Sequence, residues 1–273
     1  MMARKLGLAA TLVLALSAAA LASPREDNRV AEAVQVVNDV MAMPDQRAPD
    51  WLLRRAYGIA ILPSVVKAGL GIGGRGGKGV LLIRDPQGHW TSPAFITLAG
   101  GSIGWQIGVQ TSDLILVFTT KRSVEGLTGG KVTLGADASV AAGPVGRQAS
   151  GATDLQLQSE VYSYSRTQGL FAGIAIDGSV ISIDHKANGS YYERSGILAS
   201  DIFAMDASKA PAGAQRLLEA VRKLPGAADG GTAPAASAPA AAPAPTAAPP
   251  PNAPGLESSG ATAYPLEPQT PHR

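Results

Sequence analysis

Four cationic side chains gather in one glycine-rich stretch of the chain and could together bind a phosphate group. They are Lys67, Arg75, Lys78 and Arg84, which fall within 18 residues, and no acidic residue follows until Asp85. Glycine-rich loops expose backbone N–H groups, and such groups together with Lys or Arg side chains can hold phosphate oxygens. The alternative interpretation is a solvated loop edge that binds nothing.

A serine motif invites an enzymatic interpretation. The stretch 100–104 fits the GxSxG pattern of serine hydrolases, with Ser102 at its centre. That chemistry needs a turn from strand to helix, a histidine that accepts the hydroxyl proton and an acid that orients the histidine. The residues after Ser102 are typical of a strand, and the three histidines lie in a predicted turn, near a strand end and in the tail. A hydrolase centred on Ser102 stays as one alternative.

Nucleotide and metal motifs lack the structural context that they need. The stretch 69–74 satisfies GxGxxG, but more glycine and then a strand follow it, whereas a dinucleotide site needs a helix there. Gly77-Lys78 lacks the hydroxyl residue that a phosphate loop places after its lysine. The acidic and histidine residues show no metal-ligand spacing, and the chain has no cysteine. We therefore expect a protein that is not an enzyme and uses no cofactor or metal.

Hydrophobic periodicity predicts helices at both ends of a β-rich body. Residues 26–43 and 211–224 each place apolar residues at helical spacing. In the first helix these residues are Val30, Val34, Val37 and Met41. They are interpreted as core packing, with a membrane-facing surface as the alternative. Short helices are predicted at 51–56 and 121–127, and strands at 58–62 (ended by Pro63), 80–83, 94–98, 103–109, 114–119, 132–140, 155–164, 170–176 and 180–183, with Asp177-Gly178 as a hairpin turn.

The distribution of glycine indicates a strongly coiled sheet. Of the 32 glycines, 25 lie between residues 58 and 196, and many fall inside predicted strands. Glycine within a strand costs stability unless a bulge, a sharp coil or a close backbone approach requires it. Because helices and strands do not alternate, a doubly wound fold is disfavoured. The expected class is α+β, mainly antiparallel β, with a flattened barrel or sandwich between N- and C-terminal helices.

The two ends of the chain differ in composition from its middle. Residues 1–22 have a charged start, an apolar run and a small-residue cleavage signal, which together predict a secretory signal peptide. Residues 225–273 hold 12 of the 20 prolines and almost no large apolar residue, which predicts a disordered Pro/Ala-rich tail. The folded domain is expected at 23–224. The expected localisation is export to a bacterial periplasm, where the protein could associate with a membrane.

The net charge of the body points to an anionic surface as a partner. Residues 51–224 carry 17 basic and 12 acidic residues. This modest excess suits an anionic surface better than sequence-specific nucleic-acid recognition, which uses a denser basic stripe. We therefore expect no nucleic-acid partner.

Several strings in the middle region resemble one protein family. They include Gly58-Ile-Ala-Ile-Leu-Pro63, Gly74-Arg-Gly-Gly-Lys-Gly-Val80, Gly100-Gly-Ser-Ile-Gly-Trp-Gln-Ile-Gly108, 133–147 and 162–166. These strings are similar to those of SYLF domains, also called Ysc84-type domains, and the resemblance covers about residues 30–224 in order. It implies a lipid-binding module, since eukaryotic relatives bind phosphoinositides, partly through an N-terminal amphipathic helix and basic residues, and some bind actin.

The resemblance implies which residues would contact lipid here. The matching positions are the helix at 26–43 and the four cations of the glycine-rich stretch, and Arg147 and Arg166 are further candidates for contact with a lipid headgroup. Because export would separate the chain from actin, actin binding is not expected, and membrane phospholipid is the expected ligand. The other hypothesis is a structural or partner-binding envelope protein whose Pro/Ala-rich tail reaches another component.

Overall fold

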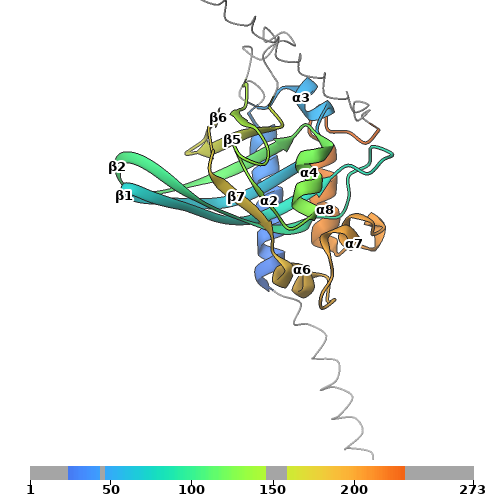
Figure 1. Ribbon diagram of the computed structural model, residues 1–273. Helices are drawn as coiled ribbons and strands as arrows, with labels where there is room; N and C mark the ends of the chain where they lie inside the picture. Colours follow the sequence, from blue (N-terminus) through green and yellow to red (C-terminus); the bar gives the residue numbers. More distant parts are fainter. Residues whose placement is uncertain (1–23, 44–46, 146–158, 231–273) are drawn as a thin grey trace, which may run out of the picture. The chain divides into compact units, whose positions relative to one another are not determined.

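The structure is a computed structural model that describes residues 24–43, 47–145 and 159–230, all within one compact unit. It is an α+β fold in which a mostly antiparallel sheet forms a strongly curled half-barrel, with helices from both ends of this region packed on it (Figure 1). The expected fold class is therefore confirmed. Among these residues, no helix is both long enough and apolar enough to cross a membrane.

The predicted helices are present, and three short ones were missed. The predicted helices correspond to α2 (Pro24–Met41), α3 (Asp50–Arg54), α4 (Lys121–Thr128) and α8 (Ala212–Arg222). The missed elements are α6 (His185–Tyr191), α7 (Ala199–Phe203) and the 3₁₀ turn η2 (Ala207–Lys209). They are too short to show a clear apolar period, so tertiary packing decides them.

Helix α2 covers one face of the sheet with its valine stripe. Val30 and Val37 are fully buried in a core that also contains the apolar side of α8, while Val34 and Met41 are partly buried against that core. The interpretation of this stripe as core packing is confirmed. A second core lies on the other face of the sheet, where α4 and α7 pack.

The sheet is built on two unusually long strands, β1 (Gly58–Ile83) and β2 (Ala94–Phe118), which pair antiparallel along their whole length. The predicted strand end at Pro63 is wrong, because β1 continues through it. The pairing register shifts between Leu62 and Val65, and Ser64 has φ 53° while its N–H donates to Asp113 Oδ1 at 3.0 Å. This irregularity places Pro63 at a bulge, where its missing N–H interrupts no ladder.

Both long strands turn back on themselves at the end away from the helices (Figure 1). The Arg84 N–H donates to the Tyr57 carbonyl oxygen at 2.8 Å, which joins the two ends of β1. Nearer the turn, a methyl group on Gly77 would lie 2.7 Å from Val65 Cγ2, and one on Gly79 would overlap the Ile61 carbonyl oxygen. Glycine is required at these positions because the two halves of β1 approach so closely.

Five shorter strands complete the sheet, which runs β3-β7-β2-β5-β4, with β1 paired to β2 and β6 paired to β5. They are β3 (Lys131–Thr133), β4 (Val140–Ala142), β5 (Val161–Thr167), β6 (Leu170–Gly173) and β7 (Ser179–Ile183). The single strand predicted at 132–140 is thus two strands, β3 and β4. The hairpin predicted at Asp177-Gly178 is also wrong, because β6 pairs with β5 whereas β7 pairs with β2 and β3. Gly178, at φ 73°, instead turns the chain from one part of the sheet to another.

Candidate functional site

The four cations of the glycine-rich stretch do not form one cluster, because strand alternation divides them between the two faces of β1. Side chains of successive strand residues point to opposite faces. Lys67 and Arg75 therefore share the face of Val65, which belongs to the core beneath α4. Lys78 and Arg84 have the opposite parity and share the face covered by α2 and α8.

Lys67 and Arg75 lie on the two halves of β1, on either side of the seam where these halves approach each other. The two halves of β1 approach closely at two points that flank these residues. At the first, a methyl group on Gly77 would lie 2.7 Å from Val65 Cγ2. At the second, a methyl group on Gly73 would lie 2.7 Å from the Cα of Gly69. Residues 67 and 75 are midway between these two contacts, and no register shift occurs within either segment. The fold thus places two cations that are eight residues apart in sequence on one face, on either side of the seam.

Arg75 and Lys67 have different environments. Lys67 is exposed and forms no ion pair within the described part of the chain. Arg75 is half-buried, and burial lowers the pKa of its guanidinium while the Asp177 carboxylate opposes that shift. Its Nε is buried and has no hydrogen-bond partner among the described residues. Because arginine stays protonated in proteins, the pair presents two positive charges with one carboxylate nearby.

Lys78 is engaged in holding α2 and α6 to the sheet. Its Nζ lies 3.5 Å from Asp184 Oδ2, and Arg29 Nη1 lies 3.8 Å from the same oxygen. The Arg29 guanidinium also stacks over the Phe95 ring at 5.3 Å. Asp184 in turn caps α6, since its Oδ1 accepts from the Ala187 N–H at 3.0 Å. Lys78 therefore has a structural role.

Arg84 is a buried structural residue, with only 6% of its surface exposed. Its guanidinium lies 4.5 Å from the centre of the Trp90 ring, and its Nη1 donates to the Gly88 carbonyl at 2.9 Å and the Ala228 carbonyl at 3.3 Å. Trp90 Nε1 donates to the Ala227 carbonyl at 2.6 Å. These bonds hold the segment after α8 against the turn that follows β1.

The remaining predicted residues are distributed elsewhere. Arg166 bonds two carboxylates, with Nη1 2.7 Å from Asp113 Oδ2 and Nη2 2.8 Å from Asp39 Oδ2, so it ties α2 to the sheet. Arg147 lies outside the described residues. Ser102 lies within β2, opposite Gly73, so a strand continues where the hydrolase motif requires a turn into a helix.

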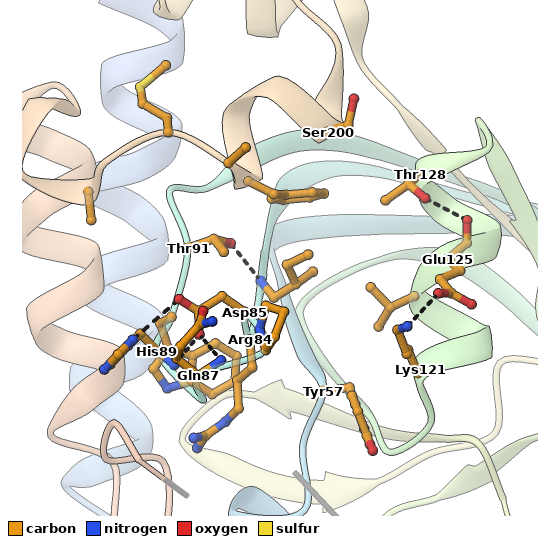
Figure 2. Close-up of a pocket in the computed structure, with 18 of the residues that line it drawn as sticks. Tyr57, Arg84, Asp85, Gln87, His89, Thr91, Lys121, Glu125, Thr128 and Ser200 are labelled. Atoms are coloured by element: carbon orange, nitrogen blue, oxygen red, sulfur yellow. Dashed lines mark hydrogen bonds and ion pairs between the residues drawn. The ribbon is translucent and has the colours of Figure 1, made fainter. Parts of the chain in front are cut away.

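A cleft of about 1080 Å³ was not predicted from the sequence (Figure 2). Its walls come from five separate segments: Tyr57, residues 83–91, α4, residues 200–207 and Arg222 of α8. No sequence pattern could indicate it, because these segments meet only in the fold. Within the described residues there is no group of three His, Asp or Glu side chains that could bind a metal.

The formal charges that line the cleft balance, because Arg84, Lys121 and Arg222 are matched in number by Asp85, Glu125 and Asp206. Lys121 Nζ lies 3.2 Å from Glu125 Oε1, and His89 Nδ1 lies 3.3 Å from Asp85 Oδ2 (Figure 2). Arg222 Nε lies 2.6 Å from Asp229 Oδ2. The cleft therefore offers little attraction to an anion, whereas the pair of Lys67 and Arg75 does.

These features define the structural class of the protein, a curled β half-barrel flanked by helices. Residues 99–224 match the model of the Ysc84 family, described as "Las17-binding protein actin regulator". This part of the chain matches a Ysc84-type (SYLF) domain, and the resemblance found in the sequence is confirmed.

Curated proteins similar to this chain include YSC84 and YSC84-like proteins. SH3 domain-containing YSC84-like protein 1 of Bos taurus is 39% identical over 177 residues, which cover 64% of this chain and 51% of the relative. Protein YSC84 of Saccharomyces cerevisiae is 38% identical over 151 residues, 54% of this chain and 32% of the relative. LAS seventeen-binding protein 3 of the same species is 37% identical over 151 residues, 54% of this chain and 33% of the relative. The chain thus spans about half of the animal relative and a third of the yeast ones.

Proposed function

We propose that the chain is a non-enzymatic binding module that holds the anionic headgroup of a phospholipid between Lys67 and Arg75. The observation that carries this proposal is the placement of both cations on one face, on either side of the seam of β1. The other described cations of the predicted set, Lys78, Arg84 and Arg166, already hold the fold together.

The electrostatics of the seam support this assignment. Both cations lie on one face of the turned-back strand β1, and like charges near each other on one face of a sheet repel. A phosphate between Lys67 and Arg75 would replace that repulsion with two charge-assisted hydrogen bonds.

Charge reversal at the seam tests the proposal. In co-sedimentation of the full chain with phosphatidylglycerol–phosphatidylcholine vesicles, K67E/R75E should bind at least about thirtyfold more weakly than the unmodified chain, because each cation near an anionic membrane contributes about 1 kcal/mol. Binding of the unmodified chain should weaken as salt rises, since exposed charges are screened over about 8–10 Å.

The matched control is K121E/K223E, which changes the net charge equally. Both lysines are exposed and paired with a glutamate four residues along a helix, away from the seam. This variant should keep most of the vesicle binding. Equal losses in the two double variants would mean that net charge alone drives binding, and the assignment to the seam would be wrong.

A protein partner is the second candidate, and the names of the relatives favour it. The family description and a yeast relative both name binding to Las17. In this chain a partner could be reached through the Pro/Ala-rich segment 225–273. Affinity capture with the full chain and with a chain truncated after residue 230, which keeps the contacts of Ala227 and Asp229, tests this. Equal capture by both would remove the segment from the proposal.

We also propose that the protein is exported and acts in the cell envelope. The support is the sequence pattern of residues 1–22. Intact mass of the protein recovered from a periplasmic fraction should correspond to a chain that begins near residue 23. Recovery of the full-length mass from the cytoplasmic fraction would contradict export.

A further inference from the structure

The turned-back end of the β1–β2 ribbon exposes large apolar side chains. Val66 is 42% exposed and Val109 is 72% exposed. In the antiparallel register Val66 pairs with Thr111 and Val109 pairs with Ala68. Paired residues point to the same face, as do residues two apart on one strand, so these four exposed side chains form one surface. We call it the ribbon patch.

The ribbon patch lies on the opposite face of the ribbon from the proposed headgroup pair. Lys67 follows Val66 directly on β1, so its side chain points the other way. The end of the ribbon is therefore amphipathic, with apolar side chains on one face and Lys67 and Arg75 on the other. Figure 1 shows that this end extends away from α2 and α8, so neither helix covers it.

We propose that the ribbon end lies in the interfacial layer of an anionic bilayer, with Val66 and Val109 among the acyl chains. This inference rests on the proposed function, because it takes the same phospholipid as the ligand. Elements with one apolar and one cationic face bind at this depth, where the hydrophobic effect and the attraction of anionic headgroups act together. Lys67 and Arg75 would then lie at the level of the phosphates.

The size and charge of the surface favour a bilayer over a protein partner. A stable protein interface buries about 800 Å² on each side, and a patch of two valines, one alanine and one threonine is much smaller. A bilayer needs no complementary surface, and its anionic headgroups complement the two cations. Two inserted valines are sufficient to strengthen vesicle binding by roughly tenfold or more.

A single-cysteine probe tests the insertion. Because the chain has no cysteine, V109C can be labelled selectively with an environment-sensitive nitrobenzoxadiazole (NBD) fluorophore. Adding phosphatidylglycerol–phosphatidylcholine vesicles should raise the emission of the probe and shift it to the blue, and lipids with a spin label on the acyl chain should quench it. The control is L198C, an exposed site before α7, whose emission should stay unchanged.

Substitution of the patch completes the test. V66D/V109D should lose about tenfold or more in vesicle binding, whereas L170D, at the exposed start of β6, should not. If the full chain binds vesicles but the V109C probe stays in water, insertion is wrong and the headgroup proposal survives. If the full chain shows no salt-dependent binding, both fail. If V66D/V109D dissociates a dimer without affecting vesicle binding, the patch serves a second copy of the chain, and the inference is overturned.

Discussion

Replacing Arg166 by methionine should destabilise the fold rather than act on lipid directly. Arg166 joins Asp39 of α2 to Asp113 of β2, and the three side chains are 26%, 24% and 18% exposed. Asp113 also accepts from the Ser64 N–H, so the network supports the bulge of β1. Methionine keeps the apolar stem of the side chain and removes its charge.

The magnitude follows from the partial burial of this network. Exposed ion pairs contribute about 0–1 kcal/mol, and breaking a buried pair costs about 3–5 kcal/mol. For two pairs that are each about one quarter exposed, R166M should lower the free energy of unfolding by about 2 kcal/mol. With a urea dependence of about 2 kcal/mol per molar, the denaturation midpoint should fall by about 1 M.

Urea denaturation followed by circular dichroism measures this shift. K223M is the control, because Lys223 and Glu219 form an exposed pair within α8, and its midpoint should change by less than about 0.3 M. A midpoint for R166M equal to that of the unmodified chain would refute the structural role of Arg166. Loss of vesicle binding by a fully stable R166M would instead place Arg166 in the headgroup site.

Three further outcomes are expected. In urea denaturation, G79A should destabilise the fold by about 1–3 kcal/mol, because its methyl group meets the β1 backbone. The control G101A has open space around the added methyl group and should change stability by less than about 0.5 kcal/mol. W90F, which loses the hydrogen bond to Ala227, should speed tryptic cleavage near the end of α8. Burial raises the pKa of Tyr191 to about 12. The stability contributed by its neutral phenol should therefore be complete below about pH 10 and should be lost as pH rises towards 12. Tyrosinate absorbance follows this ionisation.

The fold class could be predicted because composition and period depend on local physics. The apolar spacing of α2 and α8 and the density of glycine indicated terminal helices and a coiled sheet, and both are present. The course of β1 could not be predicted. Pro63 normally ends a strand, and only the bulge beside Ser64, fixed by Asp113 from a distant part of the chain, lets the strand continue.

The candidate site was predictable in residue type but not in arrangement. Sequence proximity grouped four cations, yet strand alternation places Lys78 with Asp184 and Arg84 against Trp90 on the other face. The placement of Lys67 and Arg75 on either side of one seam depends on how β1 turns back, which is a long-range property of the sheet. Spacing alone could not separate cations that hold the fold from cations available to a ligand.

A double-mutant cycle on vesicle affinity tests most directly whether Lys67 and Arg75 share one phosphate. The cycle compares K67A, R75A and K67A/R75A with the unmodified chain by co-sedimentation at fixed salt. We expect each single variant to lose nearly as much affinity as the double variant, with a coupling free energy of about 1 kcal/mol or more. Losses that simply add would indicate a diffuse electrostatic field, and no loss in any variant would contradict a headgroup site at the seam.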